Sequence, residues 1–260
     1  MIKLSNRLQA VADYVTPGSR LADIGSDHAL LPASLLLGGR CPRAIAGELN
    51  LGPMQAAQRQ AAAAGLTDRL DVRQGDGLEV LEPGEADTVT ISGMGGALIR
   101  SILEKGKADG KLDSVRELVL QPNIGEDAVR SWLLEERWYL AGETILEEDG
   151  KTYEILHAVR TDDAERLNGK LYDAAILPDG MDGPIAQAIL LRMGPHLLRQ
   201  ADDALNRKWR GELAKQRRIA DQMGDSDLPQ AAAKRQQLLK EISMIEEVLN
   251  CLPTVNRSSN

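Results

Sequence analysis

The stretch Leu21-Ala22-Asp23-Ile24-Gly25-Ser26-Asp27-His28 decides the fold of this chain. An apolar run ends there in a glycine, two acids and a histidine, and a second apolar segment follows from 29 to 37. This order predicts a buried strand, a tight turn and the start of a helix. Free N–H groups at a helix start attract anionic ligand groups such as carboxylates. We expect either a ligand site at this turn or a plain helix start capped by Ser26 or Asp27.

The acids of the turn narrow the class of ligand. The turn has Gly25 but lacks the second and third glycines of the dinucleotide fingerprint. The carboxylates of Asp23 and Asp27 would repel a diphosphate and attract a cation. S-adenosylmethionine carries a sulfonium and an ammonium group, so it suits these acids. The pattern favours S-adenosylmethionine as the cofactor, held by a turn that includes Gly25 and Ser26.

Glu48 lies at a position in the sequence that suits contact with the ribose of such a cofactor. Glu48 lies at the end of the next apolar segment, 44 to 49, and 23 residues beyond Gly25. At this separation, an acid at the end of a second strand meets a ribose held over the first turn. We therefore expect Glu48 to accept hydrogen bonds from ribose hydroxyl groups.

Glycines follow the third and fourth expected strands. Asp76 and Gly77 come after the segment 70 to 74, and Gly93 comes after the segment 87 to 92. Glycine allows the backbone to approach a ligand, and the Asp76 carboxylate can accept from adenine N6. Each motif alone is also consistent with an ordinary turn or a close-packed helix start. Ligands bind at the carboxyl ends of parallel strands in open α/β sheets, so we expect these residues at one edge.

Strands and helices alternate through residues 1–160. A fifth strand is expected over 117–121, and strands over 138–146 and 153–159 are joined at Asp149-Gly150, a hairpin signal. The pattern predicts an α/β fold with a doubly wound sheet and one antiparallel strand near its edge. This is the Rossmann-like architecture of class I methyltransferases.

A different composition begins at about residue 161. Asp, Gly and Pro become frequent, which predicts a connector with turns. Apolar residues then step by threes and fours from Leu205 to Met223 and from Leu228 to Leu252. We expect residues 161–260 to form a connector and an antiparallel helical hairpin, a short coiled coil.

The charge is unevenly distributed along the chain. The net charge is -8, but residues 195–260 hold eleven Lys and Arg against nine Asp and Glu, so the other 194 residues carry -10. Between residues 207 and 218 the sequence has six basic residues and only one acid, Glu212. The basic residues are Arg207, Lys208, Arg210, Lys215, Arg217 and Arg218. Lys208, Lys215 and Arg218 share one helical face, which suits contact with RNA phosphates. A solvated helix face explains the same charges.

The N-terminal segment predicts a short amphipathic helix over 4–15 with Ser5 as its N-cap. Asn6 and Arg7 lie in its first turn. An arginine there opposes the helix dipole, which suggests contact with a substrate in place of a helix-stabilising role. A plain surface arginine is the alternative.

The sequence disfavours disulfide-rich, metal-binding, secreted and membrane proteins, because it lacks their patterns. Cys41 and Cys251 lie far apart and lack metal-type spacing, so we expect no disulfide framework and no metal. No signal peptide or membrane-length apolar run is visible. We expect a cytoplasmic protein without membrane contact, and no motif indicates a protein partner.

Taken together, the motifs resemble those of the TrmK family of bacterial tRNA adenine-N1 methyltransferases, which modify adenine 22. The matching motifs are Leu4-Ser5-Asn6-Arg7-Leu8, Ala22-Asp23-Ile24-Gly25-Ser26-Asp27-His28-Ala29, Ala46-Gly47-Glu48, Gly52-Pro53, Arg73-Gln74-Gly75-Asp76-Gly77-Leu78, Gly93-Met94-Gly95-Gly96, Leu120-Gln121-Pro122-Asn123 and Glu147-Glu148-Asp149-Gly150-Lys151. The resemblance implies that Asp23, Gly25, Glu48 and Asp76 bind S-adenosylmethionine and that Asp27 is catalytic. It also implies tRNA as the partner.

Adenine N1 has a lone pair that attacks a sulfonium methyl group directly, so alignment and charge stabilisation are the tasks of such an enzyme. We expect Asp27 against the N1/N6 edge of the base, with His28 orienting it or moving a proton. Two alternatives remain open: a methyltransferase for a small molecule, and a non-catalytic adaptor that binds the cofactor and recruits a partner through its coiled coil.

Overall fold

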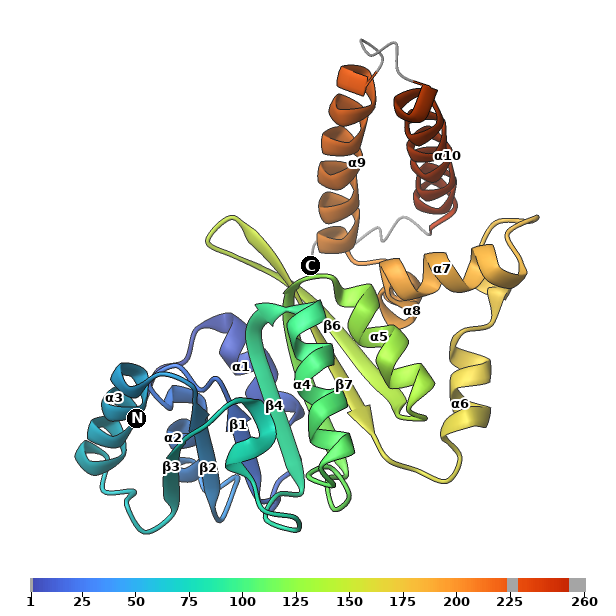
Figure 1. The fold of residues 1–260 in the computed structure, drawn as a ribbon. Helices are drawn as coiled ribbons and strands as arrows, with labels where there is room; N and C mark the ends of the chain where they lie inside the picture. Colours follow the sequence, from blue (N-terminus) through green and yellow to red (C-terminus); the bar gives the residue numbers. More distant parts are fainter. Residues whose placement is uncertain (1, 224–228, 253–260) are drawn as a thin grey trace, which may run out of the picture. The chain divides into compact units, whose positions relative to one another are not determined.

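The computed structural model describes residues 2–223 and 229–252, and these divide into two compact units between Gly169 and Lys170 (Figure 1). The stretch after residue 160, predicted as a connector, contains helix α6 (Ala164–Leu171). Asn168 connects this helix to residues 138–140, because its buried side chain donates to the Trp138 carbonyl at 2.8 Å and accepts from the Leu140 N–H at 3.3 Å. These bonds satisfy backbone groups of that segment.

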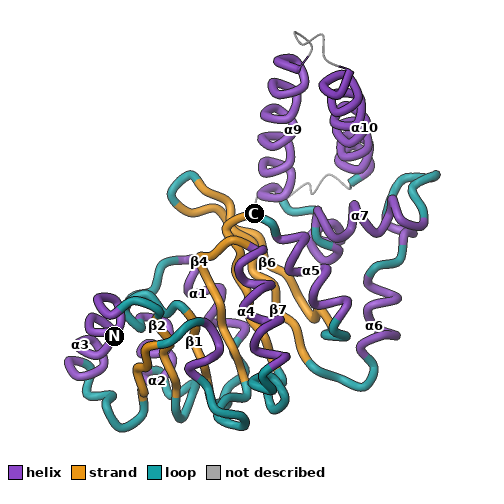
Figure 2. Tube along the Cα trace, in the orientation of Figure 1, coloured by secondary structure: helices purple, strands orange, loops and turns teal. Residues whose placement is uncertain are grey.

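The first unit contains one seven-stranded sheet in the order β3-β2-β1-β4-β5-β7-β6 (Figures 1 and 2). Strand β7 runs antiparallel to both of its neighbours and the other pairs are parallel, as the sequence predicts. The strands are β1 (Leu21–Ile24), β2 (Ala44–Glu48), β3 (Leu70–Gln74), β4 (Thr88–Gly95), β5 (Glu117–Ile124), β6 (Tyr139–Glu148) and β7 (Lys151–Val159). Because β1 to β5 are parallel, their carboxyl ends meet at one edge.

Helices cover both faces of the sheet (Figure 1). One layer contains α1 (Asn6–Tyr14), α2 (Leu30–Leu37) and α3 (Leu51–Ala63); the other contains α4 (Gly96–Ala108) and α5 (Glu126–Glu135), and a short helix η1 (Gly77–Val80) follows β3. All residues of β1 and β2 are buried, as expected of central parallel strands. The buried face of α5 contains Trp132 and Leu133, together with Val129 and Arg130.

Strands β6 and β7 form the predicted hairpin, which turns at Asp149 (φ 50°) and Gly150 (φ 71°). A fully buried ion cluster ties this hairpin to α5: Arg130 pairs with Glu143 of β6, at 2.6 Å, and with Glu154 of β7. Paired and buried charges fix the geometry of the elements that carry them. The hairpin is thereby held in place next to the carboxyl edge of the sheet.

The second unit is helical. It contains η2 (Ala174–Ile176), α7 (Gly183–Met193), α8 (Pro195–Gln200), α9 (Asp203–Met223) and α10 (Pro229–Cys251). Helices α9 and α10 lie side by side in opposite directions, which confirms the helical hairpin (Figure 1). Its buried seam includes Leu205, Trp209, Leu213, Ala220, Ile242, Ile245 and Leu249. Leu228, which we placed in the same pattern, lies outside the described residues.

None of the described helices has the length and apolar character to cross a membrane. Among the residues that the structure describes, no three His, Cys, Asp or Glu side chains form a group that could hold a metal ion.

Candidate active site

The turn after β1 does not have the capped geometry of a plain helix start. Asp27, His28 and Ala29 all have positive φ, at 40°, 64° and 56°, and helix α2 begins at Leu30 without a side-chain cap. The Ser26 hydroxyl donates to Asp23 instead of capping the helix. The alternative of a plain helix start capped by Ser26 or Asp27 is therefore wrong. Three consecutive left-handed residues are strained, and such strain is typical of functional sites.

Asp23, in β1, stabilises this turn through hydrogen bonds to its carboxylate. Its carboxylate accepts hydrogen bonds from the hydroxyls of Ser26 and of Thr90, the latter at 2.6 Å. Burial raises the pKa of Asp23, and the two hydroxyl bonds lower it. The acid predicted at the cofactor therefore also fixes the shape of the turn, by bridging β1, β4 and the loop.

Glu48 at the end of β2 has a buried carboxylate oxygen, Oε1, which has no hydrogen-bond partner among the residues that the structure describes. Burial raises the pKa of this carboxyl, and the charges of Asp23 and Asp27 raise it further, against a backbone hydrogen bond from Asp27. An unsatisfied buried carboxylate is costly unless a ligand supplies donors. Two adjacent ribose hydroxyls are donors of the required kind.

A cavity of about 360 Å³ opens at the carboxyl edge of β1, β4 and β5, next to the β6–β7 hairpin. It is lined by Arg7, Leu8, Asp23, Gly25, Ser26, Asp27, Ser92, Gly93, Met94, Asn123 and Tyr153. The structure thus brings together six predicted site residues: Arg7, Asp23, Gly25, Ser26, Asp27 and Gly93. The Ser92 hydroxyl at this cavity is buried and has no partner among the described residues, so it is a further donor for a ligand.

The backbone at Gly25 favours glycine, because its φ is +69°. A Cβ atom added there would lie 2.2 Å from the Met94 methyl carbon, which is the end of a flexible side chain and would have to move. Met94, which the sequence reasoning did not select, therefore packs directly on the turn.

Asp27 and His28 lie at the surface of the site. Their side chains are 86% and 58% exposed, and Asp27 Oδ1 lies 3.5 Å from His28 Nε2. Asp27 lines the cavity, whereas His28 is outside the lining and touches it only through Asp27. This placement agrees with a base that enters from solvent and meets the Asp27 carboxylate.

Gln121 organises the opposite wall and was missed as a site residue. Its fully buried amide oxygen accepts from Arg7 at 2.6 Å and from the Gly93 N–H at 3.1 Å. Its amide nitrogen donates to the Pro122 carbonyl at 2.8 Å and to Asn123 at 3.2 Å. The signal that could have found it is a polar residue before Pro-Asn at the end of an apolar strand.

The N-terminal helix is fixed to the β6–β7 hairpin. Ser5 caps it as predicted, accepting from the Leu8 N–H at 3.2 Å. Glu148 accepts from the backbone N–H groups of Asn6, at 2.6 Å, and of Arg7, at 3.2 Å. Asn6 is exposed and enters this contact through its backbone, whereas the Arg7 side chain reaches the cavity.

Asp76 and Gly77 lie apart from this cavity. They line a separate hollow of about 80 Å³ between η1 and α4. The Asp76 carboxylate is largely exposed, 3.9 Å from Lys105 Nζ, and Gly77 has a φ of +56°. The structure therefore does not join these two predicted cofactor residues to the acids of the first turn in one cavity.

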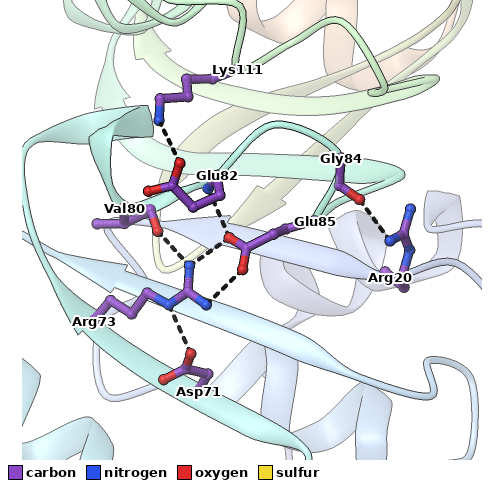
Figure 3. Close-up of polar contacts among 8 residues, drawn as sticks. All are labelled: Arg20, Asp71, Arg73, Val80, Glu82, Gly84, Glu85 and Lys111. Atoms are coloured by element: carbon purple, nitrogen blue, oxygen red, sulfur yellow. Dashed lines mark hydrogen bonds and ion pairs between the residues drawn. The ribbon is translucent and has the colours of Figure 1, made fainter.

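A third hollow, of about 270 Å³, lies near the amino ends of β1, β2 and β3. Figure 3 shows the charges there: Arg73 pairs with Glu85 at 2.6 Å and with Asp71 at 2.7 Å. The Arg73 guanidinium lowers the pKa of Glu85 to about 2. Arg20, drawn in this figure with the Gly84 carbonyl to which it donates at 2.7 Å, also pairs with Asp87 at 2.7 Å. The hollow lies at the amino ends of the strands, away from the edge where open α/β sheets bind ligands, so it is not the candidate site.

The predicted basic face belongs to α9 in the second unit. Lys215 pairs with Glu212 at 2.7 Å, Arg218 Nε donates to the Ala214 carbonyl at 3.3 Å, and Lys208 lies 5.8 Å from the Trp209 ring. Glu212 is the one acid within residues 207–218, and the folded chain adds a second, because Glu246 of α10 pairs with Arg217.

The strand order and a cavity at the carboxyl edge of the parallel strands define a class I methyltransferase fold. The family model for TrmK, tRNA (adenine(22)-N(1))-methyltransferase, matches residues 21–247. The chain belongs to this family.

Individual proteins that are similar to this chain support the same family assignment. A Bacillus subtilis (strain 168) protein named tRNA (adenine(22)-N(1))-methyltransferase is 43% identical over 250 residues, covering 96% of this chain and 98% of that protein. The crystal structure of the B. subtilis M1A22 tRNA methyltransferase TrmK matches with a TM-score of 0.84 at 41% identity, over 96% of this chain and all of that chain. The crystal structure of a Streptococcus pneumoniae protein in complex with S-adenosyl-L-methionine matches with a TM-score of 0.78 at 36% identity. The match covers 95% of this chain and 100% of that chain.

Proposed function

We propose that this chain is a cytoplasmic enzyme that transfers the methyl group of S-adenosylmethionine to N1 of adenine 22 in tRNA. Family membership supports the reaction and its substrate. The observation that carries the proposal to this chain is the unpartnered Glu48 oxygen next to the acid-lined turn of Asp23 and Asp27. A buried carboxylate of this kind suits a neutral polyol and a cation, and it would repel a diphosphate.

The residues of the turn fit this cofactor. S-adenosylmethionine supplies a methyl group activated by its positive sulfur. Glu48 would hold the ribose hydroxyls, and Gly25 allows close approach of the backbone. The buried carboxylate of Asp23 favours a cationic group over the turn, whereas the exposed carboxylate of Asp27 is left for the base. Asp76 and Gly77, at the end of β3, remain proposed contacts for the adenine end of the cofactor.

Asp27 carries the proposed chemistry on the base. Its exposed carboxylate at the cavity can accept a hydrogen bond from the adenine N6 group and thereby turn N1 toward the transferred methyl. Methylation at N1 makes the ring cationic, and the adjacent carboxylate stabilises this charge. His28 restricts the orientation of Asp27 from outside the cavity. The target base must leave its stack to reach these groups.

Turnover with different acceptors tests the proposed function. We expect labelled methyl groups from S-adenosylmethionine to enter bulk tRNA and not free nucleosides. Transfer to a small molecule at an equal or higher rate would favour a small-molecule methyltransferase. Binding of the cofactor without transfer to any acceptor would indicate an adaptor.

The helical hairpin is the proposed tRNA contact, and its basic face can be tested by neutralisation. Changing Lys208, Lys215 and Arg218 to Gln should weaken tRNA binding about tenfold and lower the salt dependence by about two to three counterions, because phosphate contacts release bound cations. The measurement is tRNA affinity against salt concentration. The affinity for S-adenosylmethionine should not change.

A matched control removes the same charge elsewhere. Arg43, Arg69 and Arg116 are exposed and precede β2, β3 and β5, at the edge of the sheet opposite the site. Their change to Gln should leave the salt dependence of tRNA binding near that of the wild type. If both triple variants behave alike, the α9 face is simply solvated and only net charge matters.

A further inference from the structure

Arg7 is held in the active-site cavity, and within the described part of the chain its guanidinium uses only one of its donor nitrogens in a hydrogen bond. Among the described residues that line the cavity, it is the one cationic side chain. Its guanidinium donates from one nitrogen to Gln121 Oε1 at 2.6 Å and lies 5.4 Å from the centre of the Tyr153 ring. Guanidinium has five N–H donors in a planar fork, so several remain available to an anion.

The contacts of Arg7 locate this anion on one side of the site. The features that fit the cofactor, Gly25 and Glu48, follow β1 and β2. Arg7 instead contacts Gln121 of β5 and Tyr153 of β7, and its guanidinium lies 3.7 Å from the position of a Cβ atom on Gly93 of β4. In the sheet, β2 lies on one side of β1, and β4, β5 and β7 lie on the other side. Arg7 therefore faces the half of the sheet that the cofactor does not occupy, where the second substrate can bind.

We propose that Arg7 binds a phosphate that flanks the extruded adenosine, and that Gln121 is the residue that positions Arg7 for this contact. The proposal rests on the proposed function, which supplies an RNA substrate. A phosphate next to a flipped nucleotide is the anion that must enter this half of the cavity with the base. Bidentate binding of phosphate by arginine fixes the position of the sugar and so of the attached base.

Gln121 can impose one orientation because both ends of its amide are engaged. Its NH₂ group donates to the Pro122 carbonyl and to Asn123, so its oxygen must face Arg7 and the Gly93 N–H. Asn123 in turn donates to the Gly93 carbonyl at 2.7 Å. The Arg7 backbone is fixed separately, by Glu148. The guanidinium is therefore pre-organised before RNA binds, which lowers the entropy cost of the contact.

A double-mutant cycle between the protein and the RNA tests the contact. Two full-length tRNAs are prepared, each with one neutral methylphosphonate in place of a phosphate, on the 5′ or the 3′ side of the target adenosine. For the wild-type enzyme, one substitution should lower kcat/KM about tenfold or more, because a charge-assisted bond is lost. For Arg7→Gln, the same substitution should have an effect of less than about twofold.

The controls separate this contact from other roles. Lys3→Gln removes an exposed cation from the same segment, outside the cavity lining, and should keep the full effect of the methylphosphonate. If Arg7→Gln and the wild type lose the same factor at both positions, Arg7 does not bind either phosphate. A loss of S-adenosylmethionine affinity in Arg7→Gln would instead assign the cofactor carboxylate to Arg7. Wild-type turnover of unmodified tRNA tests the proposed function separately.

Two variants of Gln121 test its positioning role, with thermal melting to confirm folding. Gln121→Glu keeps acceptor oxygens for Arg7 and should retain most of the discrimination between phosphate and methylphosphonate. Gln121→Leu removes the acceptor and should reduce the discrimination to less than about threefold, while S-adenosylmethionine affinity stays near that of the wild type. If folded Gln121→Leu discriminates as the wild type does, Gln121 does not position Arg7.

Discussion

Replacing Asp27 with asparagine should lower kcat for tRNA about 100-fold, while the affinity for S-adenosylmethionine changes by less than about threefold. Asparagine keeps the size of the side chain and tolerates the left-handed backbone at this position (φ 40°). It loses the negative charge that stabilises the cationic adenine. Because this charge forms only as the methyl is transferred, the loss should appear in kcat and not in ground-state binding.

Asp149→Asn is the matched control for this prediction. Asp149 is also exposed and left-handed, with φ 50°, and it lines none of the described cavities. Its variant should keep the wild-type kcat. If Asp27→Asn lowers cofactor affinity and kcat by the same factor, Asp27 is a ligand of the cofactor and does not act on the base.

Replacing Glu48 with alanine should weaken S-adenosylmethionine binding about tenfold or more, since hydrogen bonds to a charged acceptor contribute about 1.5–3 kcal/mol each. The buried Oε1 atom at the end of β2 has no other described partner, so the ligand bonds are its only compensation. Calorimetric titration measures this effect. An unchanged affinity would remove Glu48 from the cofactor site.

The same residue should show a cost to stability in the free protein. Burial raises the pKa of Glu48 above its ordinary value of 4.5, so folding disfavours the ionised form. Glu48→Gln should therefore raise the Tm of the free protein at neutral pH. Stability of the wild type rises as pH falls through the raised pKa, so the difference in Tm should disappear below about pH 4.5. A lower Tm for Glu48→Gln at neutral pH would contradict this account.

The strands and the first turn were predictable because their signals are local. Apolar runs that end in glycine or acids mark the carboxyl ends of β1 to β4, and Asp149-Gly150 marks the hairpin turn. Strand ends were less predictable. Strand β4 continues to Gly95 and β5 to Ile124, because the two strands stay paired through an irregular register after Ser92.

The opposite wall of the site was harder to predict, because the only local signal there is Gln121 before Pro122-Asn123 at the end of an apolar strand. Gln121, Asn123 and Tyr153 come from β5 and β7, and their roles depend on bonds to residues that are distant in sequence. The pairing of β5 with β7 brings these strands together, and no spacing in the chain indicates which side chains then meet. The same reason explains why a helix cap at Ser26 could be considered as an alternative from the sequence, since the bond of this hydroxyl to Asp23 forms only in the folded turn.

Mapping the methylated nucleotide tests the central claim most directly. The purified enzyme is incubated with S-adenosylmethionine and a single unmodified tRNA that has adenine at position 22, and the product is digested and sequenced by mass spectrometry. The account predicts one added methyl group, on N1 of adenine 22, and none after incubation with a tRNA that has another base there. Methylation of the exocyclic N6 group, or of a different nucleotide with adenine 22 unmodified, would contradict it.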